Sequence, residues 1–253
     1  YGLDQQTPDH STLSRTRHRL PLELHVDVFT WVLKVLAKEK LLKGKTVAVD
    51  ATTLEANAAM RSIVRRDTEA SYLDYIRQLA EESGIETPAL EDLRRFDKKR
   101  KKKKTSNDDW KHPHDPDAKI LKMKDGRTHL AHKAEHAIDL ETNAIVAVTL
   151  STGEEGDTDS LRSTLLEAQT NLEQLAEDED VAGKIHKQPV SEVVADKGYH
   201  SNDVLVNLKE SNICSYISEP DRGRRDWKGK QEEQVAVYAN RRRIKGNRGQ
   251  RLR

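Results

Sequence analysis

The chain has 253 residues, of which 35% are hydrophobic and 34% charged, and its formal net charge is +1. This length allows one large domain or two of ordinary size, and with only two Phe the core must be mostly aliphatic. No apolar run is long enough to span a membrane, and the single cysteine, Cys214, excludes an internal disulfide framework, so we expect a cytoplasmic protein without a membrane partner.

The first predicted helix follows Pro21. Apolar residues recur there at spacings of four and three, which is typical of one face of an amphipathic helix. They are Leu24, Val28, Trp31 and Val35. We expect this helix to end at Gly44.

A short strand at Val47–Val49 follows and runs directly into Asp50. A carboxylate at the end of a buried apolar run is costly unless something pairs with it. Asp50 therefore either caps a helix that follows or holds a metal ion.

Residues 66–95 are predicted to be helical and polar. Their apolar stripe consists of Tyr72, Tyr75, Ile76 and Leu79. The segment Asp97–Ser106 contains seven consecutive basic residues, for which we expect a mobile loop. Two prolines in the sequence HPHDPD predict a turn at residues 112–117. His112, His114 and Asp115 could be ligands, but no cysteine lies near enough to suggest zinc.

A β-hairpin is predicted from residues 129–140 and 144–150, with Asn143 at a left-handed turn position. We expect structural roles for His132 and His136, which lie on one face of its first strand. A helix is predicted to follow over residues 161–177. Asp157 is expected to cap it.

A second short strand, Glu192–Ala195, also runs into a carboxylate, Asp196. Asp196 begins the sequence DKGY, and its side chain could equally serve a turn that uses Gly198. A short helix at Ser201–Lys209 and a strand at Ile213–Ser218 complete the pattern.

This order of elements predicts an α/β fold, in which three antiparallel strands and then helix-linked strands form one mixed sheet covered by helices. If the strands at 47 and 192 are neighbours, Asp50 and Asp196 meet at one end of the sheet. Two carboxylates there would repel each other unless a divalent cation lay between them, and Mg²⁺ prefers oxygen ligands. Paired metal ions of this kind catalyse phosphoryl displacement.

Charge is segregated along the chain. Residues 151–180 contain ten acidic residues and one basic residue, whereas residues 221–253 contain twelve basic and four acidic residues. The basic segment indicates a polyanionic partner, and the alternative is solvated charge on exposed helices.

Two motifs, VAVDATTLEANA at 47–58 and VVADKGYHS at 193–201, resemble the catalytic core of bacterial insertion-sequence transposases of the DDE type. Residues 2–21 resemble the N-terminal helical domain of these enzymes. Residues 114–161 resemble the stretch between their first two catalytic aspartates.

The resemblance implies two regions. Residues 1–44 would be a helical region that binds DNA ends, and residues 45–253 a ribonuclease H-like mixed sheet with flanking helices. A helical and basic insertion is expected at about 60–128. We expect both regions to be incomplete, at the N-terminus and C-terminus respectively.

By this resemblance, Asp50 and Asp196 are catalytic and are the first two of three carboxylates that hold two Mg²⁺ (or Mn²⁺) ions. The residues expected to support these motifs are Thr52, Gly198, Tyr199 and Tyr238. Gly198 would permit the turn after Asp196, and Tyr199 would pack or position the motif.

The third acid of the family is a Glu on a late helix, and here the chain departs from the pattern. Tyr238 and Arg241 fit the family's Tyr and Arg, but Lys245 stands where the Glu would be. We therefore expect the third ligand beyond Arg253, with Glu232 or Glu233 as the alternative.

The implied function is that of a DNA transposase, which cleaves element ends and joins them to target DNA. This function implies double-stranded DNA as the partner and a homodimer in the DNA complex. It also implies association with the nucleoid. The residues expected to contact phosphates are Lys101, Lys102, Lys103, Arg241, Arg242 and Arg243. Trp110 and Trp227 could stack on bases, although anchoring of loops is the expected role. The alternatives are a catalytically incomplete DNA-binding remnant and a nuclease of the same fold.

Overall fold

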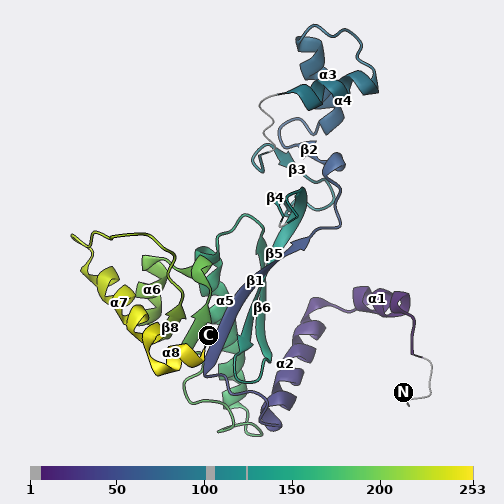
Figure 1. Cartoon of the computed structure of the whole chain (residues 1–253). Helices are drawn as coiled ribbons and strands as arrows, with labels where there is room; N and C mark the ends of the chain where they lie inside the picture. The colour runs from purple at the N-terminus through teal and green to yellow at the C-terminus, as the bar shows by residue number, and fades with distance from the viewer. Residues whose placement is uncertain (1–6, 101–105, 124, 253) are drawn as a thin grey trace.

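The computed structural model describes residues 7–100, 106–123 and 125–252. These residues form a mixed α/β structure with a six-stranded mixed sheet, flanking helices and an arm that rises from one end of the sheet (Figure 1). The strands of the sheet are β1 (Thr46–Glu55), β4 (Lys119–Lys122), β5 (Thr128–Asp139), β6 (Ile145–Thr152), β7 (Glu192–Ala195) and β8 (Cys214–Ile217).

The strand order is β4-β5-β1-β7-β8, and β6 also pairs with β5. β1 is antiparallel to β5 and parallel to β7, which is parallel to β8. The predicted hairpin is confirmed as β5–β6, and Asn143 has a φ of 61° in its turn. The mixed sheet predicted from the element order is therefore confirmed.

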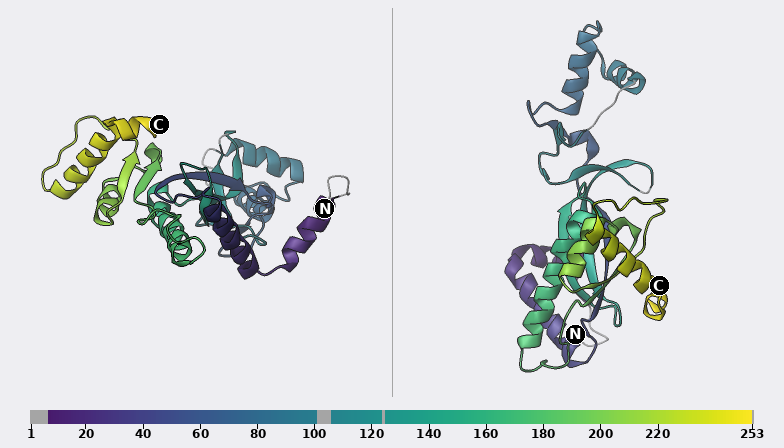
Figure 2. Two further views of the ribbon diagram at one scale, coloured as in Figure 1. Left: turned by 90° about the horizontal axis from the view of Figure 1, so that it is seen from below. Right: turned by 90° about the vertical axis from the view of Figure 1, so that its left-hand side faces the viewer.

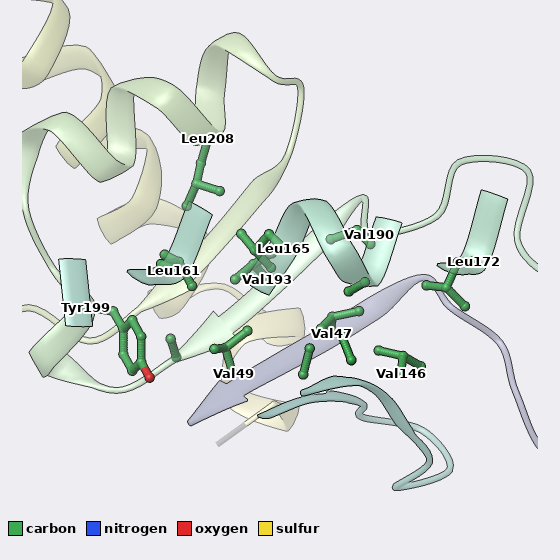
Figure 3. Packing of buried hydrophobic residues seen from close by; sticks show 14 of the residues in the cluster. Val47, Val49, Val146, Leu161, Leu165, Leu172, Val190, Val193, Tyr199 and Leu208 are labelled. Atoms are coloured by element: carbon green, nitrogen blue, oxygen red, sulfur yellow. The ribbon is translucent and has the colours of Figure 1, made fainter. Parts of the chain in front are cut away.

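The main core lies between the sheet and helix α5 (Asp157–Glu177). Figure 3 shows Val47 and Val49 of β1 pointing toward Leu161 and Leu165 of α5, and all four are buried. Alternate residues of a strand point to opposite faces, so Asp50 is directed away from this core. The predicted helix at 161–177 is confirmed, with a start four residues earlier.

Two further helices, α6 (Asn202–Glu210) and α7 (Gln231–Lys245), pack on β8, and α8 (Asn247–Arg251) follows α7. The buried Asn240 amide donates to the carbonyl of Ile217 at 2.8 Å and accepts from its N–H at 3.1 Å. This pairing attaches α7 to the edge strand, because it satisfies backbone groups that would otherwise lack a partner.

The arm consists of the described residues between β1 and β4 and stands away from the main core (Figure 2). Its elements are η1 (Met60–Ser62), β2 (Val64–Arg65), α3 (Tyr72–Glu82), α4 (Leu90–Lys99) and β3 (Trp110–Lys111). The predicted helical region 66–95 is thus two helices. Its expected apolar stripe does pack inside the arm, where Ile76 is buried. The turn predicted at 112–117 is also present.

Two helices precede the sheet, α1 (His10–Arg19) and α2 (Leu22–Lys38). α2 ends at Lys38 rather than at Gly44. Its buried face carries Leu33 and Ala37, whereas the predicted stripe is exposed, with Trp31 64% accessible. The predicted helix is thus confirmed, but its predicted apolar stripe is not the side that is buried, because α2 is apolar on more than one side. Within the described chain, no helix has the length and apolar character needed to cross a bilayer.

Candidate functional site

The two strand-associated aspartates lie on neighbouring parallel strands. β1 and β7 pair in a register that places Val49 opposite Ala195. Asp50 and Asp196 are the next residues on each strand, and both are exposed. The predicted neighbouring positions of Asp50 and Asp196 at one end of the β1–β7 pair are therefore confirmed.

Asp50 does not cap a helix. β1 continues to Glu55 and pairs with β5 along its whole length, with Asp50 opposite His136. The predicted end of the strand at Asp50 was therefore wrong. Threonines favour extended backbone, and Thr52 and Thr53 continue the strand, although pairing with β7 stops at Val49. Thr52 is exposed on this extension.

Local backbone groups bind one oxygen of each carboxylate. The N–H of Ala51 donates to Asp50 Oδ1 at 2.9 Å, and the N–H of Gly198 donates to Asp196 Oδ1 at 2.7 Å. Among the described residues, no Lys, Arg or His side chain forms an ion pair with either aspartate. The remaining oxygens are therefore available to a ligand.

A groove of about 380 Å³ runs beside the two aspartates. Its lining residues come from β1, β7, β8 and the ends of α7 and α8. They include Ala48, Asp50, Val194, Asp196, Tyr216, Ser218, Ile244, Gly249 and Leu252. The groove gives a polar ligand an open approach to both carboxylates.

The carboxylate pair fits a hard cation in its donor chemistry. Mg²⁺ binds carboxylate oxygens and keeps several waters, so that one or two protein carboxylates can suffice. Over the ranges that the structure describes, no group of three or more His, Cys, Asp or Glu side chains could hold a metal ion. Asp50 and Asp196 would therefore supply two of the oxygen ligands of such an ion.

Gly198 allows a third carboxylate to approach Asp196. A Cβ at Gly198 would lie 2.6 Å from Asp157 Oδ2 and 2.9 Å from Asp196 Oδ1. Gly198 lies in η2 (Lys197–Tyr199), and its φ is not among the positive ones. Close approach of the two carboxylates, rather than a left-handed turn, is thus what requires glycine here.

Asp157 lies near the candidate site, although the sequence analysis did not predict it as a site residue. The expected capping role was wrong, because Gly156 is the N-cap of α5 and the Asp157 carboxylate pairs with Lys133 Nζ at 2.7 Å. The segment GDTDS carries only a helix-start signal. No local pattern could have indicated a partner on β5.

Tyr199 is anchored beneath the aspartates. Its hydroxyl donates to Glu135 Oε1 at 3.0 Å, and its ring is buried in the main core (Figure 3). Burial, followed by the negative charges of Glu135, Asp157 and Asp50, raises the pKa of Tyr199. The hydroxyl therefore stays protonated and acts as a donor. These contacts agree with the expectation that Tyr199 packs and positions the motif.

The arginines expected to contact phosphate differ in their surroundings. Arg241 donates to Glu219 at 2.6 and 2.8 Å, and Arg243 donates to Ser215 at 2.9 and 3.0 Å. Arg242 is exposed. Lys101, Lys102 and Lys103 lie outside the described residues.

The remaining candidates lie apart from the aspartates. Glu232 and Glu233 lie in the first turn of α7, beside Asp203 and Asn207 of α6, and neither lines the groove. Tyr238, also on α7, is exposed and stacks edge-on with Trp227.

Both tryptophans contact aromatic and arginine side chains of the protein itself. Trp110 is buried between Tyr72 and Tyr75, and Arg225 lies 4.4 Å from the ring of Trp227. These contacts agree with the expected anchoring role.

The predicted turn at 112–117 brings its polar residues to β5. His132 lies 3.0 Å from Asp115, and His112 and His114 stack edge-on. The pairing with Asp115 agrees with the structural role expected for His132.

Comparison with known proteins adds no assignment to this geometry. No protein-family model matches the chain, and no curated protein matches it.

Proposed function

We propose that this chain acts on DNA as a transposase, cleaving the ends of a mobile element and joining them to target DNA in metal-dependent steps. The observation that supports the proposal is the placement of Asp50 and Asp196 on adjacent parallel strands, beside an open groove. Carboxylates that lie side by side without a basic partner suit divalent cations.

The fold supports the same proposal. Three antiparallel strands, β6, β5 and β1, are followed by the parallel strands β7 and β8, with helices between the later strands. This is the mixed arrangement expected of a ribonuclease H-like domain. The motif resemblance adds the two aspartate contexts on which the proposal also rests.

In this mechanism, Asp50 and Asp196 would hold two Mg²⁺ ions together with a third acidic ligand. The bound ions would generate a hydroxide nucleophile and stabilise the leaving 3′ oxygen of the phosphodiester. Asp50 is held by β1, and Asp196 by the N–H of Gly198. Tyr199 anchors the segment that carries Asp196.

Double-stranded DNA would approach along the groove and the basic C-terminal segment. Among the described residues, Arg242, Lys245 and Arg251 are exposed and can contact phosphates. Such contacts add salt-dependent affinity without sequence information. Two copies would bring the two element ends together.

A DNA-binding remnant without catalysis is the second candidate. It is favoured by one observation: the groove contains two carboxylates, and no third acidic side chain lines it among the described residues. A third candidate, a nuclease of the same fold, would share the groove and the first cleavage step.

The proposal is tested with Asp50→Asn and Asp196→Asn, and with Asp117→Asn as a control at an exposed aspartate of the arm. Calorimetric titration of Mn²⁺ and nicking of a supercoiled plasmid are the measurements. We expect both aspartate variants to lose metal binding and nicking, and Asp117→Asn to retain both. Metal binding that is identical in all four proteins contradicts the proposal. Metal binding without nicking in the wild type supports the remnant.

A further inference from the structure

A network of polar side chains is buried beneath the two aspartates. Its members are at most 6% exposed and come from β5, α5 and η2. We call the following residues the buried network: Lys133, Glu135, Ser160, Thr164 and Tyr199.

Glu135 is the centre of this network. Its Oε1 accepts from Ser160 Oγ at 2.7 Å and from the Tyr199 hydroxyl at 3.0 Å, and its Oε2 accepts from Thr164 Oγ1 at 2.5 Å. Lys133 Nζ donates to Ser160 Oγ at 2.8 Å and lies 3.6 Å from Glu135 Oε1. The buried carboxylate thus has three donors and a neighbouring cation.

The network is not explained by stability alone. Taking a carboxylate and an ammonium out of water is costly, and apolar side chains of similar volume often stabilise a core at least as well. A fully bonded polar cluster instead fixes the relative positions of the elements that it joins. Here it joins elements from three separate parts of the chain.

The network contacts the segment of Asp196 at two points. Tyr199 ends η2, whose N-cap is Asp196 itself. Lys133 holds Asp157 at 2.7 Å, and the Asp157 carboxylate lies against Gly198 on the side facing Asp196. The contact through Tyr199 anchors the end of η2 that is farther from Asp196. The contact through Asp157 limits where the Asp196 carboxylate can lie.

We infer that Glu135 and Lys133 are positioning residues, which act through Tyr199 and Asp157 to hold the Asp196 carboxylate where it binds a divalent cation. This inference rests on the metal-binding role proposed for Asp196. Hydrogen-bonded partners behind metal ligands commonly account for 10- to 100-fold in metal affinity.

Tyr199→Phe is the sharpest test, because it removes one hydroxyl and leaves the buried ring in place. Tyr72→Phe is the matched control: the Tyr72 hydroxyl also donates to a carboxylate, Asp97, at 3.1 Å, but in the arm. We expect the affinity of Tyr199→Phe for Mn²⁺ to be about 10-fold lower than that of the wild type. The affinity of Tyr72→Phe should be unchanged. The readouts are Mn²⁺ electron paramagnetic resonance titration and, separately, the thermal unfolding midpoint.

Ser160→Ala provides a second variant, since it removes a donor to Glu135 without touching η2. We expect the same direction of change in Mn²⁺ affinity. If Asp50→Asn loses Mn²⁺ while Tyr199→Phe and Ser160→Ala bind it like the wild type, the positioning role is overturned and the proposed function stands. If the wild type itself binds no Mn²⁺, both are overturned.

Discussion

At the scale of single residues, the candidate site depends on one position without a side chain. Gly198 lies between the carboxylates of Asp157 and Asp196, both within 2.9 Å of where its Cβ would be. Contacts this short force neighbouring atoms to move. The glycine therefore permits an acidic surface that no other residue would allow in this position.

Gly198→Ala is expected to displace the Asp196 carboxylate and to weaken Mn²⁺ binding about 10-fold or more. Overpacking of this kind also costs about 1–3 kcal/mol of stability. Gly246→Ala is the control, because its Cβ would lie 3.4 Å from the nearest carbonyl oxygens. Isothermal titration with Mn²⁺ and urea unfolding measure the two effects, and equal behaviour of the two variants would contradict the prediction.

Glu219 gives stability a defined pH dependence. Hydrogen bonds from Arg241, and then from Arg225, lower its pKa from 4.5 to about 2. A lowered carboxyl pKa contributes stability that is fully present above pH 4.5 and is lost as pH falls toward about 2. The contribution at pH 7 is on the order of 2–3 kcal/mol.

Glu219→Gln should therefore be destabilised at pH 7, and its deficit relative to the wild type should shrink progressively below pH 4.5. Urea unfolding at pH 7 and at pH 3 measures this. Glu232→Gln, at an exposed glutamate on α7, is the control. A deficit of equal size at both pH values would show that the ion pairs with Arg241 and Arg225 are not its source.

At the scale of elements, α5 is the helix whose buried face packs against the sheet in the main core. Its inward face includes Leu161, Leu165 and Leu172, all buried, and Leu172 lies against Gly44 just before β1. The N-terminus of the same helix supplies Asp157 and Ser160 to the region beneath the aspartates. Packing of one helix thus sets both the core and the site.

Leu172→Ala is expected to cost about 2–5 kcal/mol, because it leaves a cavity in a fully buried position. Leu166 lies on the same helix and is 63% exposed, so Leu166→Ala should stay within about 0.5 kcal/mol of the wild type. Urea unfolding compares the two. A similar decrease in the free energy of unfolding in both variants would mean that α5 does not pack in this orientation.

At the scale of the whole molecule, the arm and the main core are separate packing units. The main core contains β1, β7 and α5, whereas a separate cluster around Ile76 lies inside the arm, and a third cluster packs Trp110 of the arm against Leu130 of β5. The two are joined by β1 and β5, which run from one into the other (Figure 1). We therefore expect the arm to open without unfolding the sheet.

Trp110→Ala tests this independence. Trp110 is 2% exposed, and its removal should destabilise the arm by about 3–5 kcal/mol. Hydrogen exchange followed by mass spectrometry should show lost protection over residues 60–100 and 106–118, and retained protection in β7 and α5. A uniform loss of protection across the chain would indicate that the arm and the sheet unfold as one cooperative unit.

The sequence by itself determined the local elements. The β5–β6 hairpin with Asn143, the strand β7 and the helix α5 all follow from periodicity and turn chemistry between adjacent residues. The element order also predicted the mixed sheet and the neighbouring positions of Asp50 and Asp196.

Only the tertiary structure decided which groups meet across the fold. The buried face of α2, the continuation of β1 past Asp50, and the pairing of Asp157 with Lys133 all depend on contacts between distant segments. A helix that is apolar on two sides, or an aspartate in a helix-start motif, has the same local pattern whatever it packs against. Chain topology selects the partner, because burial and charge pairing are energies of the assembled fold.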